Sequence, residues 1–128
     1  MVKTTQHHAV EAYKTLAKYS KENFENRTVI LKLFHIKKAL FEFWDFQVEQ
    51  DQVILKACNG VSDSYGNVSF PEDTEDGANM NKFKGMEADL AATEVEVDVE
   101  PVELKLNDVP KLTIEDVEAL DGFISFIE

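Results

Sequence analysis

The longest run of apolar residues lies between Val29 and Phe46, where 12 of 18 positions are apolar. These residues recur at spacings of three and four, which is the periodicity of a helix. One stripe along this helix comprises Val29, Leu33, Ile36, Leu40 and Phe43. A second stripe, interrupted by Lys37, comprises Ile30, Phe34, Phe41, Trp44 and Val48. A helix with two apolar stripes has to be covered on two sides, by its own chain or by a partner.

The apolar pattern of the long helix continues more weakly to Ala57, and the helix is predicted to end at Asn59-Gly60, where a left-handed residue is favoured. Three further helices are expected. An earlier helix is predicted from Thr4 or Thr5 to about Tyr19, and a later one from about Asn79 to Ala92. The last helix is predicted to begin after Thr113, which resembles the start of a capping box. Its expected inward face comprises Ile114, Val117, Leu120, Ile124 and Ile127.

Residues 94–106 alternate between polar and apolar side chains, which indicates a strand. Val95, Val97 and Val99 share one face of it. The alternation changes phase after Pro101, so this proline is predicted to mark a bulge, a bend or a switch of sheet. Together these elements predict one domain over residues 1–128. Its fold class is α+β, mainly helical, with a helical N-terminal half, one long apolar helix, a short β element around residues 94–106 and a short C-terminal helix.

The charge is distributed unevenly along the chain. The net charge is −12, but residues 1–58 carry nine Lys or Arg and seven Asp or Glu, whereas residues 59–128 carry four and eighteen. The two halves therefore have charges of +2 and −14. An anionic surface repels nucleic acid and acidic membranes and attracts basic protein surfaces. The same charge also has a simpler explanation, which is that it keeps the protein soluble.

Residues that could support catalysis or metal binding do not form a recognisable pattern. Aligning Glu72–Gly77 with a calcium-binding loop places Phe83 where a bidentate glutamate is needed. Cys58 has no motif around it, and the chain contains no phosphate-binding loop or nucleophile elbow. We therefore expect no catalytic residues, no metal and no cofactor. We also expect a cytoplasmic protein, because the N-terminus lacks an apolar signal-peptide core and the long helix is interrupted by charges.

Two surfaces are candidates for binding a partner. The first is a row of four carboxylates, which would stand about 6.6 Å apart along a strand and could mimic part of a phosphate track. It comprises Glu94, Glu96, Asp98 and Glu100. The alternative is that these groups only form the solvent-exposed face of an edge strand. The second candidate, for self-association or another partner, is the stripe that contains Ile30, Phe34, Phe41 and Trp44.

Several segments resemble small uncharacterised proteins of tailed phages and prophages of Gram-positive bacteria. They are LKLFHIKKALFEF (residues 31–43), TEVEVDVEPVEL (93–104) and IEDVEALDGFISFIE (114–128), together with a central turn at residues 63–67. The resemblance covers most of the chain but includes no catalytic motif. It implies a phage or prophage origin, hence the cytoplasm of a bacterial host, and no defined activity.

The sequence therefore predicts a non-enzymatic protein-binding module. The first interpretation is an inhibitor of a host or defence factor, whose acidic surface meets a basic or nucleic-acid-binding protein. One alternative is an accessory protein of virion assembly that forms a homodimer through its long helix. A small enzyme or metal-dependent protein is a further alternative. Direct binding to nucleic acid or to a membrane is not expected.

Overall fold

The computed structural model describes residues 1–22, 24–109 and 111–128. The mainly helical α+β class predicted from the sequence is confirmed. The elements in chain order are β1 Val2–Thr5, α1 Gln6–Tyr19, α2 Arg27–Ala57, β2 Val61–Ser62, β3 Val68–Ser69, α3 Ala78–Ala92, β4 Glu94–Val97, β5 Val102–Lys105, the short 3-10 helix η1 Leu106–Asp108, α4 Ile114–Ala119 and β6 Ile124–Ile127.

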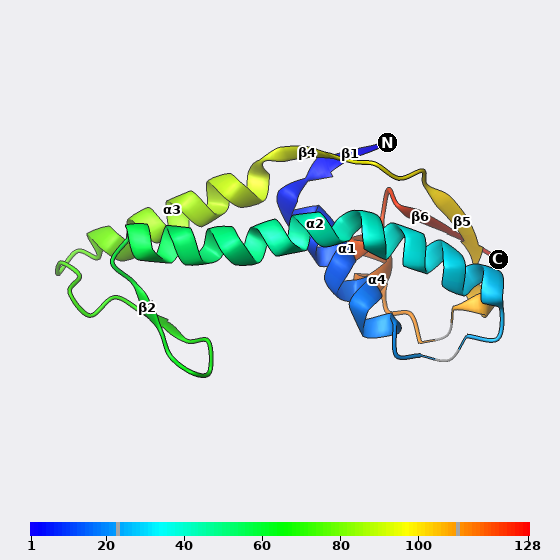
Figure 1. Ribbon diagram of the computed structural model, residues 1–128, viewed down its shortest axis with the longest axis horizontal. Coiled ribbons are helices and arrows are strands. Elements are labelled where there is room, and N and C mark those ends of the chain that lie inside the picture. The colour runs from blue at the N-terminus through cyan, green and yellow to red at the C-terminus, as the bar shows by residue number, and fades with distance from the viewer. Residues whose placement is uncertain (23, 110) are drawn as a thin grey trace.

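Helix α2 runs along the whole molecule and organises the other elements (Figure 1). The side chain of Asn26 caps its start by accepting a hydrogen bond from Thr28 N at 3.0 Å. Asn59 takes the predicted left-handed conformation at its end, with φ of 56°. Gly60 N donates to Leu55 O at 2.9 Å, which completes a Schellman-type cap. Within the described residues, no helix is both long and apolar enough to cross a membrane.

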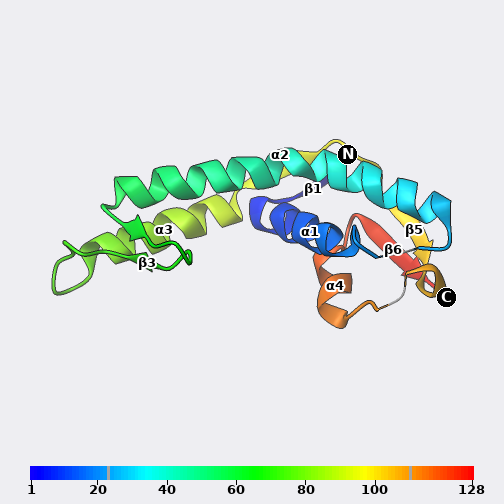
Figure 2. The ribbon, with the colours of Figure 1, turned by 60° about the horizontal axis from the view of Figure 1, so that its bottom comes forward.

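The other elements divide into two groups along α2, which we call the head and the arm (Figures 1 and 2). The head contains α1, β1, β4, β5, α4 and β6 around the N-terminal part of α2. The arm, residues 47–92, contains the rest of α2, the β2–β3 hairpin and α3. Most buried apolar side chains belong to the head, among them Ala12, Leu16, Ile36, Leu40, Val97, Leu104 and Phe123. In the arm the buried ones are Ile54, Leu55 and Cys58, and α3 has none.

Three small sheets replace the single β element expected around residues 94–106. β4 pairs antiparallel with β1, and Val97 lies opposite Val2. β5 pairs parallel with β6, and Val102 lies opposite Ile124. β2 and β3 form the hairpin of the arm. Pro101 lies between β4 and β5, so of the three predicted roles for this proline the switch of sheet is confirmed.

The predicted last helix is partly wrong. α4 begins after Thr113 with the expected capping box, but it ends at Ala119, and Ile124–Ile127 form strand β6. Gly122 reverses the chain with φ of 85°, after which β-branched and aromatic residues pair with β5. The expected inward face is also wrong at its start, because Ile114 is 80% exposed and Val117 is 39% exposed.

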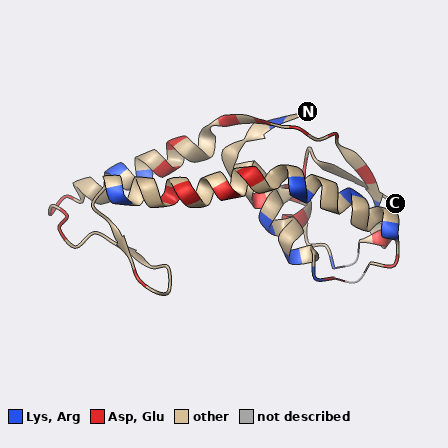
Figure 3. Ribbon diagram, viewed as in Figure 1, with Lys and Arg blue, Asp and Glu red and all other residues tan. Residues whose placement is uncertain are grey.

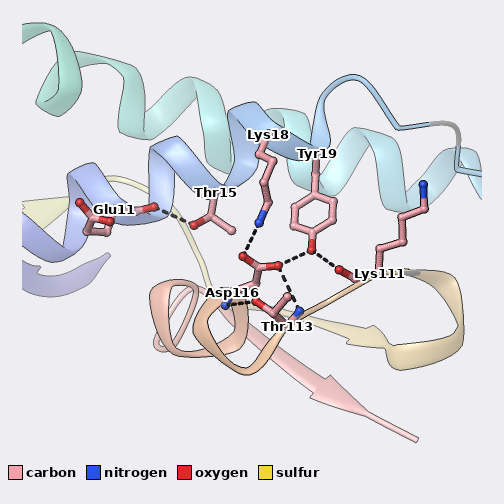
Figure 4. A network of polar contacts seen from close by, with 7 residues as sticks. All are labelled: Glu11, Thr15, Lys18, Tyr19, Lys111, Thr113 and Asp116. Atoms are coloured by element: carbon pink, nitrogen blue, oxygen red, sulfur yellow. Dashed lines mark hydrogen bonds and ion pairs between the residues drawn. The ribbon is translucent and has the colours of Figure 1, made fainter.

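A polar network holds α4 against α1 instead of an apolar stripe (Figure 4). Asp116 is buried and accepts a hydrogen bond from Lys18 Nζ at 2.6 Å and another from the Tyr19 hydroxyl. It also accepts from Thr113 N at 3.1 Å, which closes the capping box. The Tyr19 hydroxyl lies 2.8 Å from Lys111 O. One carboxylate thus caps its own helix and joins it to α1.

Candidate protein-interaction surface

The second stripe of α2 presents several exposed apolar side chains on one face of the helix. Ile30, Phe34, Phe41 and Val48 are 42%, 54%, 47% and 45% exposed, and Trp44 is half-buried. In chain order they are four, seven, three and four residues apart, which places all of them within about 40° of one line along the helix. The first stripe faces the core, where Ile36 is 1% exposed and Leu40 is fully buried. The chain therefore covers one of the two apolar stripes and leaves the other largely open.

Tyr13 of α1 forms the edge of this open stripe. Its ring stacks on Trp44 with centroids 5.3 Å apart and meets the edge of Phe41 at 6.0 Å. The Nζ atom of Lys37 lies 6.0 Å from the centre of the Tyr13 ring. Lys37, which interrupts the stripe in the sequence, thus extends its ammonium group toward an aromatic neighbour. We define the α2 stripe as Ile30, Phe34, Lys37, Phe41, Trp44 and Val48.

A groove of about 310 Å³ continues the stripe at its N-terminal end. It lies between α1 and α2, and Ile30 and Phe34 form one side of it. The other apolar lining residues are Leu16, Tyr19, Phe24 and Leu33. Sequence reasoning missed the groove and Tyr13, because both depend on how α1 crosses α2. It found the four predicted stripe residues because they all belong to one helix.

The four carboxylates predicted to form a straight row do not do so. Glu94 and Glu96 lie in β4, but this strand ends at Val97. Val99 N donates to Val97 O at 2.8 Å, which makes a tight turn at Asp98 and ends the alternation before Glu100. All four side chains are exposed and accessible to a partner. Whether they bind one stays a prediction.

Two of these carboxylates already have basic neighbours. Glu96 lies 3.9 Å from Lys3 Nζ on the paired strand β1. Glu100 lies 3.1 Å from the N-terminal ammonium of Met1. Exposed pairs of this kind contribute little to stability. They do reduce the local negative charge that a basic partner would meet.

Acidic residues in the loops of the arm cap backbone groups. Asp73 accepts hydrogen bonds from Asn79 N at 2.8 Å and Met80 N at 3.2 Å, at the start of α3, where Gly77 has no side chain to serve as the cap. The hydrogen bonds from these N–H groups lower the pKa of Asp73. Asp63 likewise accepts from Tyr65 N and Asn67 N in the hairpin, and this lowers its pKa. Asp73 and Asp63 thus hold the backbone of two loops of the arm.

A pair of carboxylates lies between α2 and α3. Asp51 and Glu87 line a cavity of about 470 Å³ beside the hairpin, together with Gln52, Leu55, Ser62, Gly66, Val68 and Phe83. Burial, and then the neighbouring Asp51, raise the pKa of Glu87 to about 7. Gln47 donates to Asp51 at 2.8 Å and is itself 3.2 Å from buried Gln6 of α1. Asp51 is therefore linked through Gln47 to Gln6 of the head, and sequence reasoning gave no sign of the carboxylate pair.

Other groups with possible chemistry have structural partners. His8 Nε2 lies 2.8 Å from Asp121 O, and buried Cys58 lies 3.8 Å from the Met86 sulfur atom. In the part of the chain that the structure describes, no three His, Cys, Asp or Glu residues are placed to hold a metal ion.

No known protein family, curated protein sequence or solved structure matches this chain. The resemblance to phage and prophage proteins therefore stays a prediction from the sequence.

Proposed function

We propose that this chain is a non-enzymatic protein-binding module and that the α2 stripe is its contact surface. One observation carries the proposal, which is that Ile30, Phe34 and Phe41 are each more than two-fifths exposed on a regularly spaced stripe. Large contiguous apolar surfaces on a folded domain are typical of sites that bind another protein. Aromatic side chains at the centre of such a surface supply most of the binding energy when they are desolvated.

The geometry favours this surface over the acidic one. The stripe is a continuous feature of one rigid helix, whereas the four carboxylates are divided by the turn at Asp98. Of the two roles that the phage resemblance implies, an accessory protein that docks through an apolar helix fits these features better. An inhibitor that imitates a line of phosphates would need a straighter and denser row of charge.

The test compares two variants of the tagged full-length chain in affinity capture from a host lysate, with an untagged copy of the chain added. The stripe variant is Phe34→Glu/Phe41→Glu, and the carboxylate variant is Glu94→Gln/Glu96→Gln/Asp98→Asn/Glu100→Gln. The stripe variant should lose whichever protein the wild type retains, whether a host protein or the untagged copy. The carboxylate variant should retain it.

All six substituted positions are exposed, so far-UV circular dichroism of both variants should show the wild-type helix content. Retention by the stripe variant together with loss by the carboxylate variant would overturn the proposal. It would make the acidic surface the site of binding.

A further inference from the structure

We infer that the occupant of the α2 stripe is a second copy of this chain, with the two α2 helices packed antiparallel. This inference rests on the proposed function and adds to it the partner and its orientation.

Helix α2 is divided into a basic block and an acidic block. Residues 27–38 contain four basic residues and no acidic one, whereas residues 42–51 contain four acidic residues and no basic one. Figure 3 shows the two blocks along the ribbon of α2, with blue toward its N-terminal end and red in its middle. The division between +2 and −14 found for the two halves of the chain does not reveal this pattern. The boundary between the blocks falls at the centre of the stripe, between Lys37 and Phe41.

Four of these charges flank the stripe on its open side. By helical periodicity Arg27, Lys38, Asp45 and Glu49 all lie within about 100° of the stripe, on the side away from the buried one. All four are exposed, and within the described residues none of them forms an ion pair. Their charges are therefore available to a partner that covers the stripe.

In an antiparallel pair of α2 helices, both the basic and the acidic block of each copy meet the opposite charge. The basic block of each copy lies against the acidic block of the other, and the two contacts are related by a two-fold axis. A parallel pair would place basic against basic and acidic against acidic, which is unfavourable. The charge pattern therefore favours a second copy of this chain as the partner, with its α2 helix antiparallel to the first.

The length of the stripe fits the same arrangement. From Ile30 to Val48 it spans about 27 Å along the helix. The next positions at the same spacing, Asp51 and Leu55, line the cavity beside the hairpin, so the open stripe ends there. In the antiparallel pair Ile30 lies opposite Val48 of the second copy, and Phe34 lies opposite its Trp44. The stripe then covers itself from end to end, and the dimer is closed.

The first experiment measures the mass of the full chain by sedimentation across a wide concentration range. The wild type should shift from the monomer mass of 14.5 kDa to twice that mass. Two charge variants, Arg27→Glu/Lys38→Glu and Asp45→Lys/Glu49→Lys, should each weaken this dimer at least about tenfold, because each brings like charges together. An equimolar mixture of the two variants should restore it, since each then faces the opposite charge.

A matched control changes the same amount of charge elsewhere. Glu115→Lys/Glu118→Lys lies on exposed positions of α4 and should leave the dimer unchanged. A wild-type mass of 14.5 kDa at all concentrations would overturn the inference. The protein-binding proposal would then depend on whether capture finds a different partner. Failure of the mixture to restore the dimer would overturn the charge pairing.

The second experiment tests direction with single cysteines. Ile30→Cys and Val48→Cys should form a disulfide with each other when mixed under mild oxidation, and neither should do so alone. The native Cys58 is fully buried, and the wild type serves as the control for it. Cross-linking by either variant alone, without a mixed product, would show a parallel pair. That result would overturn the orientation and leave the stripe as the contact surface.

Discussion

Among single residues, Asp116 forms hydrogen bonds with two residues of α1 that are remote from it in the sequence. Burial by itself would raise the pKa of this carboxyl, but hydrogen bonds from Lys18, Tyr19 and Thr113 outweigh it and lower the pKa to about 2. Burial and the same carboxylate raise the pKa of Tyr19 well above its usual range, which keeps its hydroxyl protonated as a donor. Asp116 is therefore charged throughout the neutral range and holds α4 in place.

Replacing this carboxylate should weaken the head. Asp116→Asn keeps the shape of the side chain but removes the charge from three hydrogen bonds, so the free energy of unfolding should fall by about 2 kcal/mol at pH 7. Urea denaturation measures this change. Glu118→Gln, on an exposed position of the same helix, should have almost no effect.

The pH dependence gives the same prediction a second readout. The folded pKa of about 2 lies below the unfolded value of about 3.9, so this stabilisation is complete above about pH 4 and is lost as the pH falls toward 2. The difference in stability between wild type and Asp116→Asn should shrink over that interval. A difference that stays constant down to pH 2 would contradict the assigned role of the carboxylate.

The sequence predicted the capping box of Thr113 and Asp116 because it depends on residues three positions apart. It did not predict that Asp116 is buried, because Lys18 and Tyr19 are 98 and 97 residues away. The same reason explains why the Asp51–Glu87 pair and the place of Tyr13 beside the stripe were missed. Helix caps can be predicted from the spacing of neighbouring residues, whereas contacts between residues remote in the sequence can be identified only once the fold is known.

Among the elements, α2 allows a buried residue of its first stripe to be compared with an exposed residue that lies in neither stripe. Leu40 is fully buried in the head, whereas Leu31 is 58% exposed on the same helix. Leu40→Ala should lower the free energy of unfolding by about 2–5 kcal/mol, since it leaves a cavity. Leu31→Ala removes the same atoms from a largely hydrated site, so its effect should be within about 0.5 kcal/mol. Equal effects of the two substitutions, measured by chemical denaturation, would contradict the burial of the first stripe.

Elements set by local signals were predicted well from the sequence. The first helix was predicted to start at Thr4 or Thr5, and Thr5 is the residue that caps α1. The long helix and its left-handed end at Asn59 are confirmed. Strand β1 was missed because it has only four residues and its partner β4 is remote from it in the sequence. Residues 124–127 were assigned to a helix because Ile124 and Ile127 continue the three-and-four spacing, but pairing with β5 overrides that preference.

For the whole molecule, the division into head and arm could not be predicted from the sequence. Both parts share α2, and the arm joins the head where Gln6 N donates to Thr93 O at 2.8 Å, between the start of α1 and the end of α3. In α3, Met80 is 41% exposed and no residue is buried. The arm therefore has much less buried apolar surface per residue than the head. Regions of this kind open locally before the whole chain unfolds.

Glu87 should make this opening depend on pH. Its folded pKa of about 7 lies above the unfolded value of about 4.3, so the arm is most stable, with respect to this group, below about pH 4. That stability is lost as the pH rises through 7, where Glu87 must ionise beside Asp51. The hairpin residues that line the same cavity, Ser62, Gly66 and Val68, carry no charge that could offset this effect.

Hydrogen exchange, corrected for the intrinsic pH dependence of the amides, measures both effects. Amides of α3 should be less protected than those of α1 at every pH, and their protection should fall further between about pH 5 and 8. Glu87→Gln cannot ionise, so it should remove that fall and leave α3 more protected than in the wild type at pH 8. Asp89→Asn, on an exposed position of the same helix, should behave as the wild type does.

If the amides of α3 are as protected as those of α1, the arm is not the less stable part. If Glu87→Gln keeps the wild-type pH dependence, the carboxylate pair is not its cause.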